Sequence, residues 1–488
     1  VRTRTKGLAE GSICYTNDIL NPENTKYNLK YYIDLAKEIE GAGAHILGVK
    51  DMAGLLKPYA AFELISALKS ELNIPIHLHT HDTSSIQSAT YLKAIEAGVD
   101  VVDVALGGVS GLTSQPNFNS VVEMMRFQDR ASTIDIDSLN EYSNYWEAVR
   151  EYYYPFESGL KSGSGEVFKH EIPGGQYSNL KPQARGLGLE ERFHEITKMY
   201  GDVNTLFGDI VKVTPSSKVV GDMAQYLVSN NLTIQDVLEK GETMSFPQSV
   251  VDLFRGDLGQ PVGGFPKDLQ KIILKGQKPF TNRPNAHIPA IDIDKEYKAF
   301  RKIFEHDLSR TIDYTDFLSY QLYPKVFTDA FNQHLKYDNL MNLPTKNFFY
   351  GMAIGEEIIV ELDKGKTLLI TLDSIGKANE DGIVTVYFKL NGQGRSVDIK
   401  DTSIKVDKVE NIKADKADTK QIGAPLQGML STILVKRGEK VVKNQPLFII
   451  EAMKMETTIT ATTDATVNKI VLKTGFMVNS EDLVIVLE

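Results

Sequence analysis

The sequence predicts a multidomain protein in which β/α units are followed by helices, a small β module and a carrier domain built from strands. Three observations lead to this prediction. Strand and helix patterns alternate over residues 1–130, β-rich runs separated by turn signals fill residues 347–406, and one pattern is written twice near the C-terminus. A chain of 488 residues has room for roughly two to four domains.

The first 130 residues have the pattern of parallel β/α units. We expect strands near 11–16, 45–51, 76–81 and 101–106, and helices over 26–42, 59–71, 84–97 and 117–127. Strands that alternate with helices through short connections form parallel sheets. A closed β/α barrel needs about eight such units, so these residues form either an open sheet or one half of a barrel.

The rest of the chain divides by composition. Turn signals such as Asn391-Gly392 between strand-like runs predict hairpins. Residues 409–420 have mixed charge and little apolar content, which predicts a linker with a root-mean-square span of roughly 20 Å. We therefore expect β/α units over 1–130, a helical extension over 131–341, the β module over 342–408, the linker over 409–420 and the carrier over 421–488.

Composition restricts the possible partners and compartments. The formal charge of −10 at pH 7 provides no basic surface for nucleic acid. No apolar run in the sequence is long enough to span a membrane. Cys14 is the only cysteine, which excludes an intrachain disulfide and fits a reducing compartment. We expect a cytoplasmic protein, or a protein of the mitochondrial matrix if the source is eukaryotic.

The duplicated pattern covers residues 424–451 and 461–488, at an offset of 37 residues. Gly438 of the first copy matches Gly475 of the second, and Lys454 lies in the short segment between the copies. Two similar β units with a lysine at the turn between them form a swinging-arm carrier. Such a carrier brings a tethered cofactor to its site at high local concentration.

Two histidines, His79 and His81, follow the third expected strand. They are two residues apart, so they project from the same face, which His77 shares. At the C-terminal end of a barrel strand they would face the active-site mouth, and imidazole suits Zn, Mn or Fe. A pair that only makes hydrogen bonds is an equally good interpretation, and His77 leaves open which two would bind a metal.

Two further motifs could complete a site. Lys50 ends an apolar strand just before a glycine turn, so it either faces the same mouth or extends toward solvent. Thr214 is held extended by Pro215, and a hydroxyl-rich turn then opens a helix. That turn is either functional or only the N-cap of the helix.

Together these motifs resemble the pyruvate carboxylase family of biotin-dependent enzymes over nearly the whole chain. Lipoyl domains share the carrier architecture but usually place an acidic residue before the lysine, where this chain has Met453. The segments that carry the resemblance include Val49-Lys50-Asp51-Met52-Ala53-Gly54, His79-Thr80-His81-Asp82, Pro173-Gly174-Gly175-Gln176-Tyr177, Val213-Thr214-Pro215-Ser216-Ser217-Lys218 and Ala452-Met453-Lys454-Met455.

The resemblance implies a fold and a set of residue roles. The fold would be the second half of a TIM-type β/α barrel with a helical extension, a tetramerisation and allosteric β module, and a biotinyl domain, which is a flattened barrel of two quasi-repeats. The implied roles are metal binding by carbamylated Lys50, His79 and His81, proton transfer by Thr214, lining of the biotin pocket by Ser217 and Lys218, and covalent attachment of biotin to Lys454.

The resemblance also implies an activity and partners. The carboxyl group of carboxybiotin on Lys454 would be transferred to pyruvate to give oxaloacetate, with Mn or Zn at the site. ATP with Mg would serve only an N-terminal domain absent from this sequence, so we expect the C-terminal part of a longer polypeptide, in which the family's metal-binding aspartate and pyruvate-binding arginine lie upstream. Partners would be biotin protein ligase, the other protomers of a homotetramer and acetyl-CoA as allosteric effector. Arg395 is either an anion binder or an exposed turn residue.

Two alternative functions remain open. An oxaloacetate decarboxylase or transcarboxylase subunit uses the same barrel in another direction, but such subunits usually have a long Pro/Ala-rich linker and lack a β module like residues 351–401. A non-catalytic segment, biotinylated and oligomeric but inert, belongs to a different class.

Overall fold

The computed structural model describes residues 6–283, 286, 288–304, 312–379, 382–401, 411–415, 418–452 and 455–488. The chain divides into two compact units, residues 1–286 together with 411–488, and residues 287–410. Within the described ranges, the helices are all too short or too polar to cross a bilayer.

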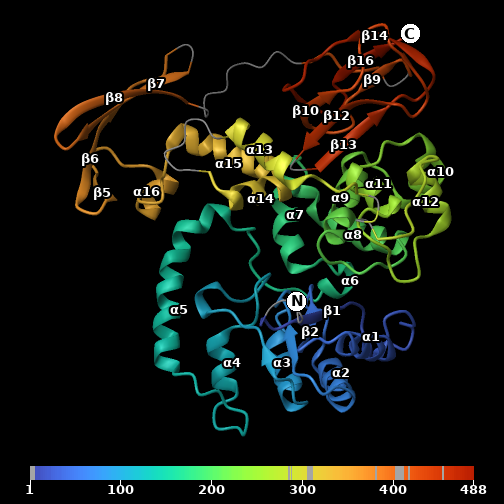
Figure 1. Cartoon of the computed structure of the whole chain (residues 1–488), viewed down its shortest axis with the longest axis vertical. Coiled ribbons are helices and arrows are strands. Elements are labelled where there is room, and N and C mark those ends of the chain that lie inside the picture. Colours follow the sequence, from blue (N-terminus) through green and yellow to red (C-terminus); the bar gives the residue numbers. More distant parts are fainter. Residues whose placement is uncertain are drawn as a thin grey trace. The chain divides into compact units, whose positions relative to one another are not determined.

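A parallel sheet opens the first unit and confirms the predicted β/α units (Figure 1). Its strands lie in the order β1 (Glu10–Tyr15), β2 (Ile46–Asp51), β3 (Ile76–His79) and β4 (Val101–Val102). The helices that follow them are α1 (Leu29–Gly41), α2 (Pro58–Glu71), α3 (Gln87–Glu96) and α4 (Phe118–Met124). β4 is shorter than predicted, because Ala105 leaves the sheet and bridges to Asn117.

The two faces of this sheet differ in character. Ile13, Val49 and Leu78 are buried against the helices in one apolar core. Residues of the opposite parity, such as Lys50 and His79, point to the other face. Because all four strands run parallel, their C-terminal ends meet at one edge, where Lys50, His79 and His81 lie.

A helical region completes the body that carries the site. Its core lies around α8 and α9 and includes Tyr200, Phe207 and Phe254. The elements are η1 (Gly107–Val109), α5 (Ile136–Arg150), η2 (Glu151–Phe156), α6 (Val167–His170), α7 (Gly174–Gly186), η3 (Glu190–Arg192), α8 (Phe193–Leu206), α9 (Ser216–Ser229), α10 (Ile234–Lys240), η4 (Gly241–Thr243), α11 (Gln248–Arg255) and α12 (Lys267–Leu274).

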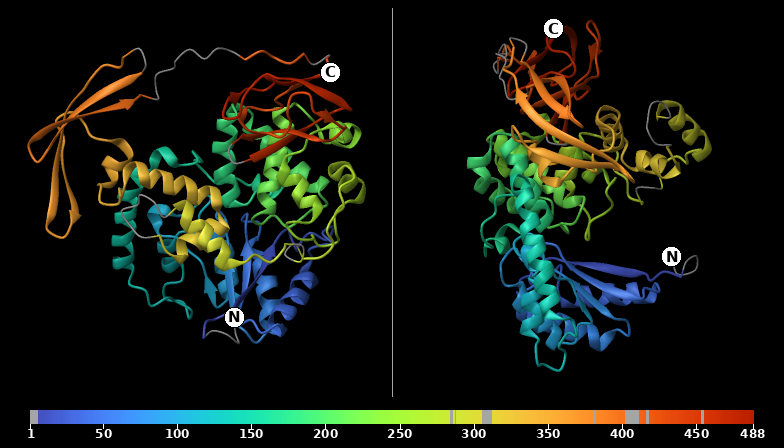
Figure 2. Two further views of the ribbon diagram at one scale, coloured as in Figure 1. Left: turned by 45° about the horizontal axis from the view of Figure 1, so that its top comes forward. Right: turned by 90° about the vertical axis from the view of Figure 1, so that its left-hand side faces the viewer.

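The second unit joins a helical cluster to an antiparallel sheet. Its helices are α13 (Ile293–Phe304), α14 (Tyr314–Leu322), α15 (Pro324–Tyr337) and α16 (Thr345–Tyr350). The strands β5 (Glu357–Asp363), β6 (Lys366–Ile375), β7 (Ile383–Leu390) and β8 (Gln393–Lys400) pair in sequence order into a twisted ribbon (Figure 2). The β-rich runs predicted within residues 347–406 are thereby confirmed as strands β5 to β8.

The carrier domain consists of two four-stranded sheets, ordered β13-β12-β10-β15 and β11-β14-β16-β9. The strands are β9 (Gln421–Gly423), β10 (Gly428–Ile433), β11 (Lys440–Val441), β12 (Pro446–Ala452), β13 (Met455–Thr460), β14 (Ala465–Ile470), β15 (Met477–Val478) and β16 (Leu483–Leu487). The sequence repeat is a structural repeat: Gly438 and Gly475 have φ angles of 82° and 85°, and Val441 and Val478 are both buried.

Residues near the start of the predicted linker, 411–414, lie against the carrier. Lys413 forms an ion pair of 2.8 Å with the buried carboxylate of Asp482, and Asn411 donates a hydrogen bond of 2.7 Å to the same group. Ala414 adds a backbone hydrogen bond to Glu481. These residues lie against the carrier because they supply the partners of a buried charge, so they are not part of a free tether.

Candidate functional site

The two predicted histidines converge at the C-terminal end of β3. The Nε2 atoms of His79 and His81 are 3.3 Å apart. Each opposite ring nitrogen has an oxygen partner: Nδ1 of His79 lies 2.7 Å from the carboxylate of Asp103, and Nδ1 of His81 lies 2.7 Å from the carbonyl oxygen of Thr113. Because both oxygens accept, both Nδ1 atoms carry the proton and both Nε2 lone pairs face each other.

This arrangement of lone pairs fits a cation. Two nitrogens about 2.1 Å from a common ion lie about 3.0–3.4 Å apart at cis-octahedral or tetrahedral angles. Burial, together with nearby His79 and Lys50, holds the pKa of His81 below its usual value, although the bond to Thr113 opposes the shift. A neutral His81 keeps its Nε2 lone pair available. No group of three His, Cys, Asp or Glu ligands occurs among the described residues.

Asp103 orients the histidines through one carboxylate. Its second oxygen lies 2.8 Å from Nε2 of His77, so His77 is occupied as a hydrogen-bonding residue. Burial raises the pKa of the Asp103 carboxyl, but the bonds from His77 and His79 outweigh it and hold that pKa below its usual value. The carboxylate therefore stays charged and fixes the proton on Nδ1 of His79.

Lys50 lies beside this pair. The register of β2 and β3 aligns Lys50 with His79, and the register of β1 and β2 aligns it with Cys14. Lys50, His79 and His81 therefore share one face and one end of the sheet. The structure brings these three predicted residues together.

The Pro173-Gly174-Gly175 turn packs against the histidines. The backbone N–H of Gly174 donates a hydrogen bond of 2.8 Å to the carbonyl of Met52, just beyond β2. A Cβ at Gly174 would lie 2.7 Å from Nδ1 of His81, whereas a Cβ at Gly175 would meet nothing within 4 Å. Only glycine leaves room for His81 at this position.

Thr214 lies in an exposed loop that a buried lysine holds against the sheet. The side chain of Lys212 is 1% exposed, and its Nζ forms an ion pair of 2.7 Å with Glu171. The same Nζ lies 3.4 Å from Oγ1 of Thr16, directly after β1. Tyr27 donates a further hydrogen bond to the carbonyl of Asp209 in this loop. The loop is therefore tied to the C-terminal end of β1.

Ser217 and Lys218 lie in the first turn of α9. Ser217 is buried, and its carbonyl accepts a hydrogen bond from Tyr200. Lys218 forms an ion pair of 2.6 Å with Asp222, whose side chain is 2% exposed. Burial raises the pKa of Asp222, although Lys218 and Ser249 oppose the shift. Thr214, Ser217 and Lys218 therefore form a second group at the start of α9.

The carrier contacts the helical region close to this second group (Figure 1). Thr457 in β13 forms an antiparallel bridge with Pro247, and Thr458 donates a hydrogen bond of 3.3 Å to the side chain of Gln248 in α11. β12 and β13 pair through Ala452 and Met455. Lys454, the predicted biotin attachment residue, lies outside the described residues.

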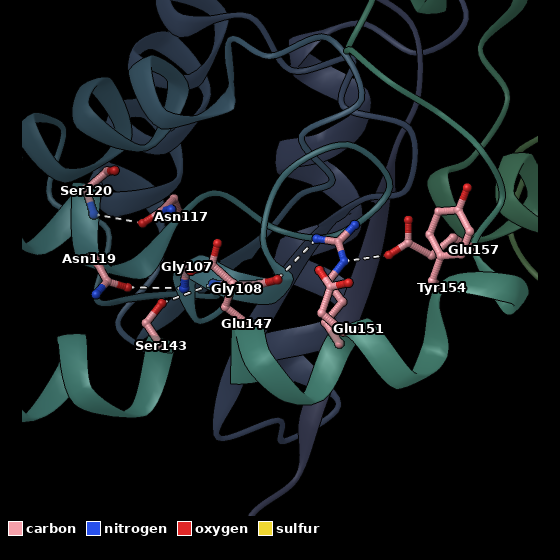
Figure 3. A pocket seen from close by; sticks show the side chains of 11 residues that line it. Gly107, Gly108, Asn117, Asn119, Ser120, Ser143, Glu147, Glu151, Tyr154 and Glu157 are labelled. Atoms are coloured by element: carbon pink, nitrogen blue, oxygen red, sulfur yellow. Dashed lines mark hydrogen bonds and ion pairs between the residues drawn. The ribbon is translucent and has the colours of Figure 1, made fainter. Parts of the chain in front are cut away.

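A separate polar pocket of about 620 Å³ lies between η1, α4, α5 and η2 (Figure 3). The backbone N–H groups of Gly107 and Gly108 donate to Asn119 and Ser143 at its wall. None of the predicted site residues lines this pocket.

Sequence reasoning missed Asp103, Gly174, Lys212 and Asp222 as residues that shape the site. Asp103 could have been found from strand parity, because it lies two residues after Val101 and faces the same side. Asp222 stands four residues after Lys218, a spacing that pairs charges on a helix. The sequence carries no signal for the contacts of Gly174 and Lys212, which join distant segments.

Three family models match the chain. They are described as "HMGL-like" over residues 18–145, "Conserved carboxylase domain" over residues 167–371 and "Biotin-requiring enzyme" over residues 420–487. Their order along the chain agrees with the sheet, the helical region and the carrier. The fold and the site define the carboxyltransferase and carrier region of a biotin-dependent carboxylase.

Individual relatives indicate which family within this class the chain resembles. Pyruvate carboxylase of Bacillus subtilis is 51% identical over 484 residues, which cover 99% of this chain and 42% of that protein. The carboxyl transferase domain of Rhizobium etli pyruvate carboxylase, solved with pyruvate, has a TM-score of 0.76 and 52% identity over 81% of this chain and 65% of that one. The same domain solved with pyruvate and biocytin has a TM-score of 0.76 and 51% identity, covering 81% and 66%.

The chain belongs to the pyruvate carboxylase family and matches the C-terminal region of its members. The resemblance seen in the sequence is thereby confirmed, and so is the predicted multidomain fold. The chain spans about two fifths of the length of the curated relatives that it matches.

The packing at Gly174 gives a testable prediction. Gly174→Ala should destabilise the protein by about 1–3 kcal/mol, because the added methyl group overpacks against the ring of His81. Gly175→Ala is the matched control and should be neutral or slightly stabilising, since its methyl group meets open space. Denaturant unfolding of both variants measures the difference, and equal stabilities would contradict the proposed packing.

Proposed function

We propose that this chain carries out the transfer half of pyruvate carboxylation. The carboxyl group carried by biotin on Lys454 is moved to pyruvate, giving oxaloacetate, and biotin protein ligase attaches the biotin. The observation that carries the proposal is the convergence of His79 and His81 beside Lys50, in a chain that also holds a biotin-requiring domain. The Rhizobium etli relative solved with pyruvate and biocytin supports the same substrates.

The proposal assigns a divalent metal, Mn or Zn, to His79, His81 and carbamylated Lys50. Such an ion supplies a Lewis acid that polarises the pyruvate carbonyl and stabilises the charge of its enolate. Asp103 and the Thr113 carbonyl keep both ring Nδ1 atoms protonated, so that both Nε2 atoms remain available as ligands.

Thr214 has the proton-transfer role in the proposal. Its hydroxyl can donate and accept without becoming charged. The reaction breaks the N–C bond of carboxybiotin, and Thr214 passes its proton to the biotin nitrogen as it takes one from the pyruvate methyl group. The enolate carbon then forms a new C–C bond with the released CO2. Ser217 and Lys218, at the start of α9, bind the biotin ring.

The metal assignment predicts that His79→Ala and His81→Ala each remove the bound ion from the purified enzyme. Loss of one ligand from a site with few protein ligands lowers affinity strongly, because the remaining groups no longer enclose the ion. Elemental analysis measures metal per chain. His77→Asn is the control and should retain the metal, since both ring nitrogens of His77 already have carboxylate partners, Glu10 and Asp103. Stoichiometric metal in the His79 or His81 variant would refute the assignment.

The catalytic assignment predicts different outcomes for two variants in a polypeptide with the full length of the relatives. Thr214→Ala should abolish carboxyl transfer to pyruvate but leave ATP-dependent carboxylation of biotin intact. Lys454→Arg should abolish both reactions and the avidin signal of attached biotin.

Loss of both half-reactions in Thr214→Ala would instead indicate a structural role. An avidin signal that survives Lys454→Arg would reject the carrier assignment. Biotin-dependent decarboxylation of oxaloacetate by the wild type excludes the inert carrier as an alternative.

We also propose that the sheet of the second unit mediates self-association into a homotetramer that responds to acetyl-CoA. Among the described residues, β8 pairs only with β7, and all of its residues are exposed. On one face it presents Val397 and Ile399, which are 45% and 49% exposed. An uncovered strand edge beside an apolar face favours pairing with a second copy.

This assembly predicts that Val397→Glu lowers the mass of the native particle, because a carboxylate replaces an apolar contact. Ser396→Glu introduces the same charge on the opposite face of the same strand and should leave the mass unchanged. Sedimentation velocity compares the two variants. A Val397→Glu particle of wild-type mass would exclude this face from the interface.

A further inference from the structure

The first turn of α11 connects the carrier to the biotin pocket. On one side, Gln248 accepts a hydrogen bond from Thr458, and Pro247 forms a β-bridge with Thr457. On the other side, the next residue, Ser249, donates a hydrogen bond of 2.6 Å to the buried carboxylate of Asp222. One helical turn therefore contacts both the moving domain and the residue that holds Lys218.

The side chain of Gln248 in α11 is held in the orientation that contacts the carrier. The side-chain N–H of Gln248 donates a hydrogen bond of 2.8 Å to Asp252, which fixes its carbonyl oxygen as the free acceptor. Thr458 supplies the matching hydroxyl. Thr457 is fully buried, and its Oγ1 has no hydrogen-bond partner within the described residues. β13 thus buries a polar side chain where it meets Pro247.

The contact with the biotin pocket passes through Asp222. One oxygen of this carboxylate accepts from Lys218 and from Ser249, both at 2.6 Å. The side chain of Lys218 is 37% exposed, so its ammonium group reaches solvent from an anchored position. A carboxylate with two fixed donors holds the lysine in one orientation.

We propose that the first turn of α11 is the docking site that holds β13 of the carrier during carboxyl transfer, and that Asp222 and Ser249 are positioning residues that hold Lys218 for the arriving biotin. The inference rests on the proposed function. Thr457 and Thr458 lie three and four residues after Lys454 in the sequence, so the docking contact is close along the chain to the proposed attachment residue.

The test compares tethered biotin with free biotin in the full-length biotinylated enzyme. Pyruvate release from oxaloacetate is measured once with attached biotin alone and once with free biotin added to a Lys454→Arg background. Thr458→Val removes the hydrogen bond between Thr458 and Gln248, and Gln248→Leu removes the same bond together with the one that Gln248 donates to Asp252. Each should lower the tethered rate relative to the free-biotin rate by about two- to tenfold. Thr458→Ser should restore the ratio, because it keeps the hydroxyl.

Thr460→Val is the matched control on the same strand, since the bridge and the hydrogen bond from β13 to the start of α11 among the described residues belong to Thr457 and Thr458. The ratio of the tethered rate to the free-biotin rate should be the same in this variant as in the wild type. Ser249→Ala should raise the KM for free biotin by a similar factor, because Lys218 loses part of its anchor while the docking contact remains.

The outcomes distinguish failure of the docking site, failure of the positioning role and failure of the proposed function. A wild-type ratio in both Gln248→Leu and Thr458→Val overturns the docking site, and so does an equal loss with tethered and free biotin. An unchanged KM in Ser249→Ala overturns the positioning role. If the wild type decarboxylates oxaloacetate with neither form of biotin, the proposed function itself fails.

Discussion

The buried ion pair between Lys212 and Glu171 is the contact on which the geometry of the site depends. The ammonium group of Lys212 is almost completely shielded from water. Its partners come from three separate segments: Thr16 after β1, Glu171 before α7 and Asp209 in the same loop as Lys212. Removing one partner of a buried pair generally costs about 3–5 kcal/mol, because the other charge stays buried without compensation. These contacts hold the Thr214 loop in one position against the sheet. The loop leads directly into α9, so they also fix the position of the residues at the start of that helix.

The proposed metal ligands, His79 and His81, depend on a second constraint, which decides the tautomer of each ring. A histidine binds a metal only through an unprotonated nitrogen, so the protein must decide which ring nitrogen keeps the proton. Asp103 decides this for His79, and the Thr113 carbonyl decides it for His81. Gly174 then limits where the ring of His81 can lie. The two rings are thus positioned by groups outside β3, whose contacts join β3 to the segment after β4 and to two later segments of the chain.

Much of this architecture could be predicted from local patterns, and the remainder could not. The β/α units, the face shared by Lys50 and His79, and the carrier repeat follow from strand parity and periodicity, which are properties of neighbouring residues. The pairing of Lys413 with Asp482 and of Lys212 with Glu171 joins residues dozens of positions apart, and single residues of either charge carry no pattern. β4 also ends earlier than predicted, and Ala105 beyond its end forms a bridge with Asn117 just before α4.

The proposed function requires the carrier to visit more than one site, and such a carrier must bind each site weakly. Among the described residues, the polar contacts between β13 and the start of α11 are one β-bridge and one side-chain hydrogen bond, each worth about 0.5–1.5 kcal/mol in net free energy. Covalent attachment compensates for this weakness, because a tether converts association into an intramolecular step at high effective concentration. Tight docking would slow release of the carrier without improving chemistry at the sheet. The buried ion pairs of Lys212 and Lys218 therefore hold residues that must stay in place. The weaker polar contacts between β13 and α11 hold the domain that must leave.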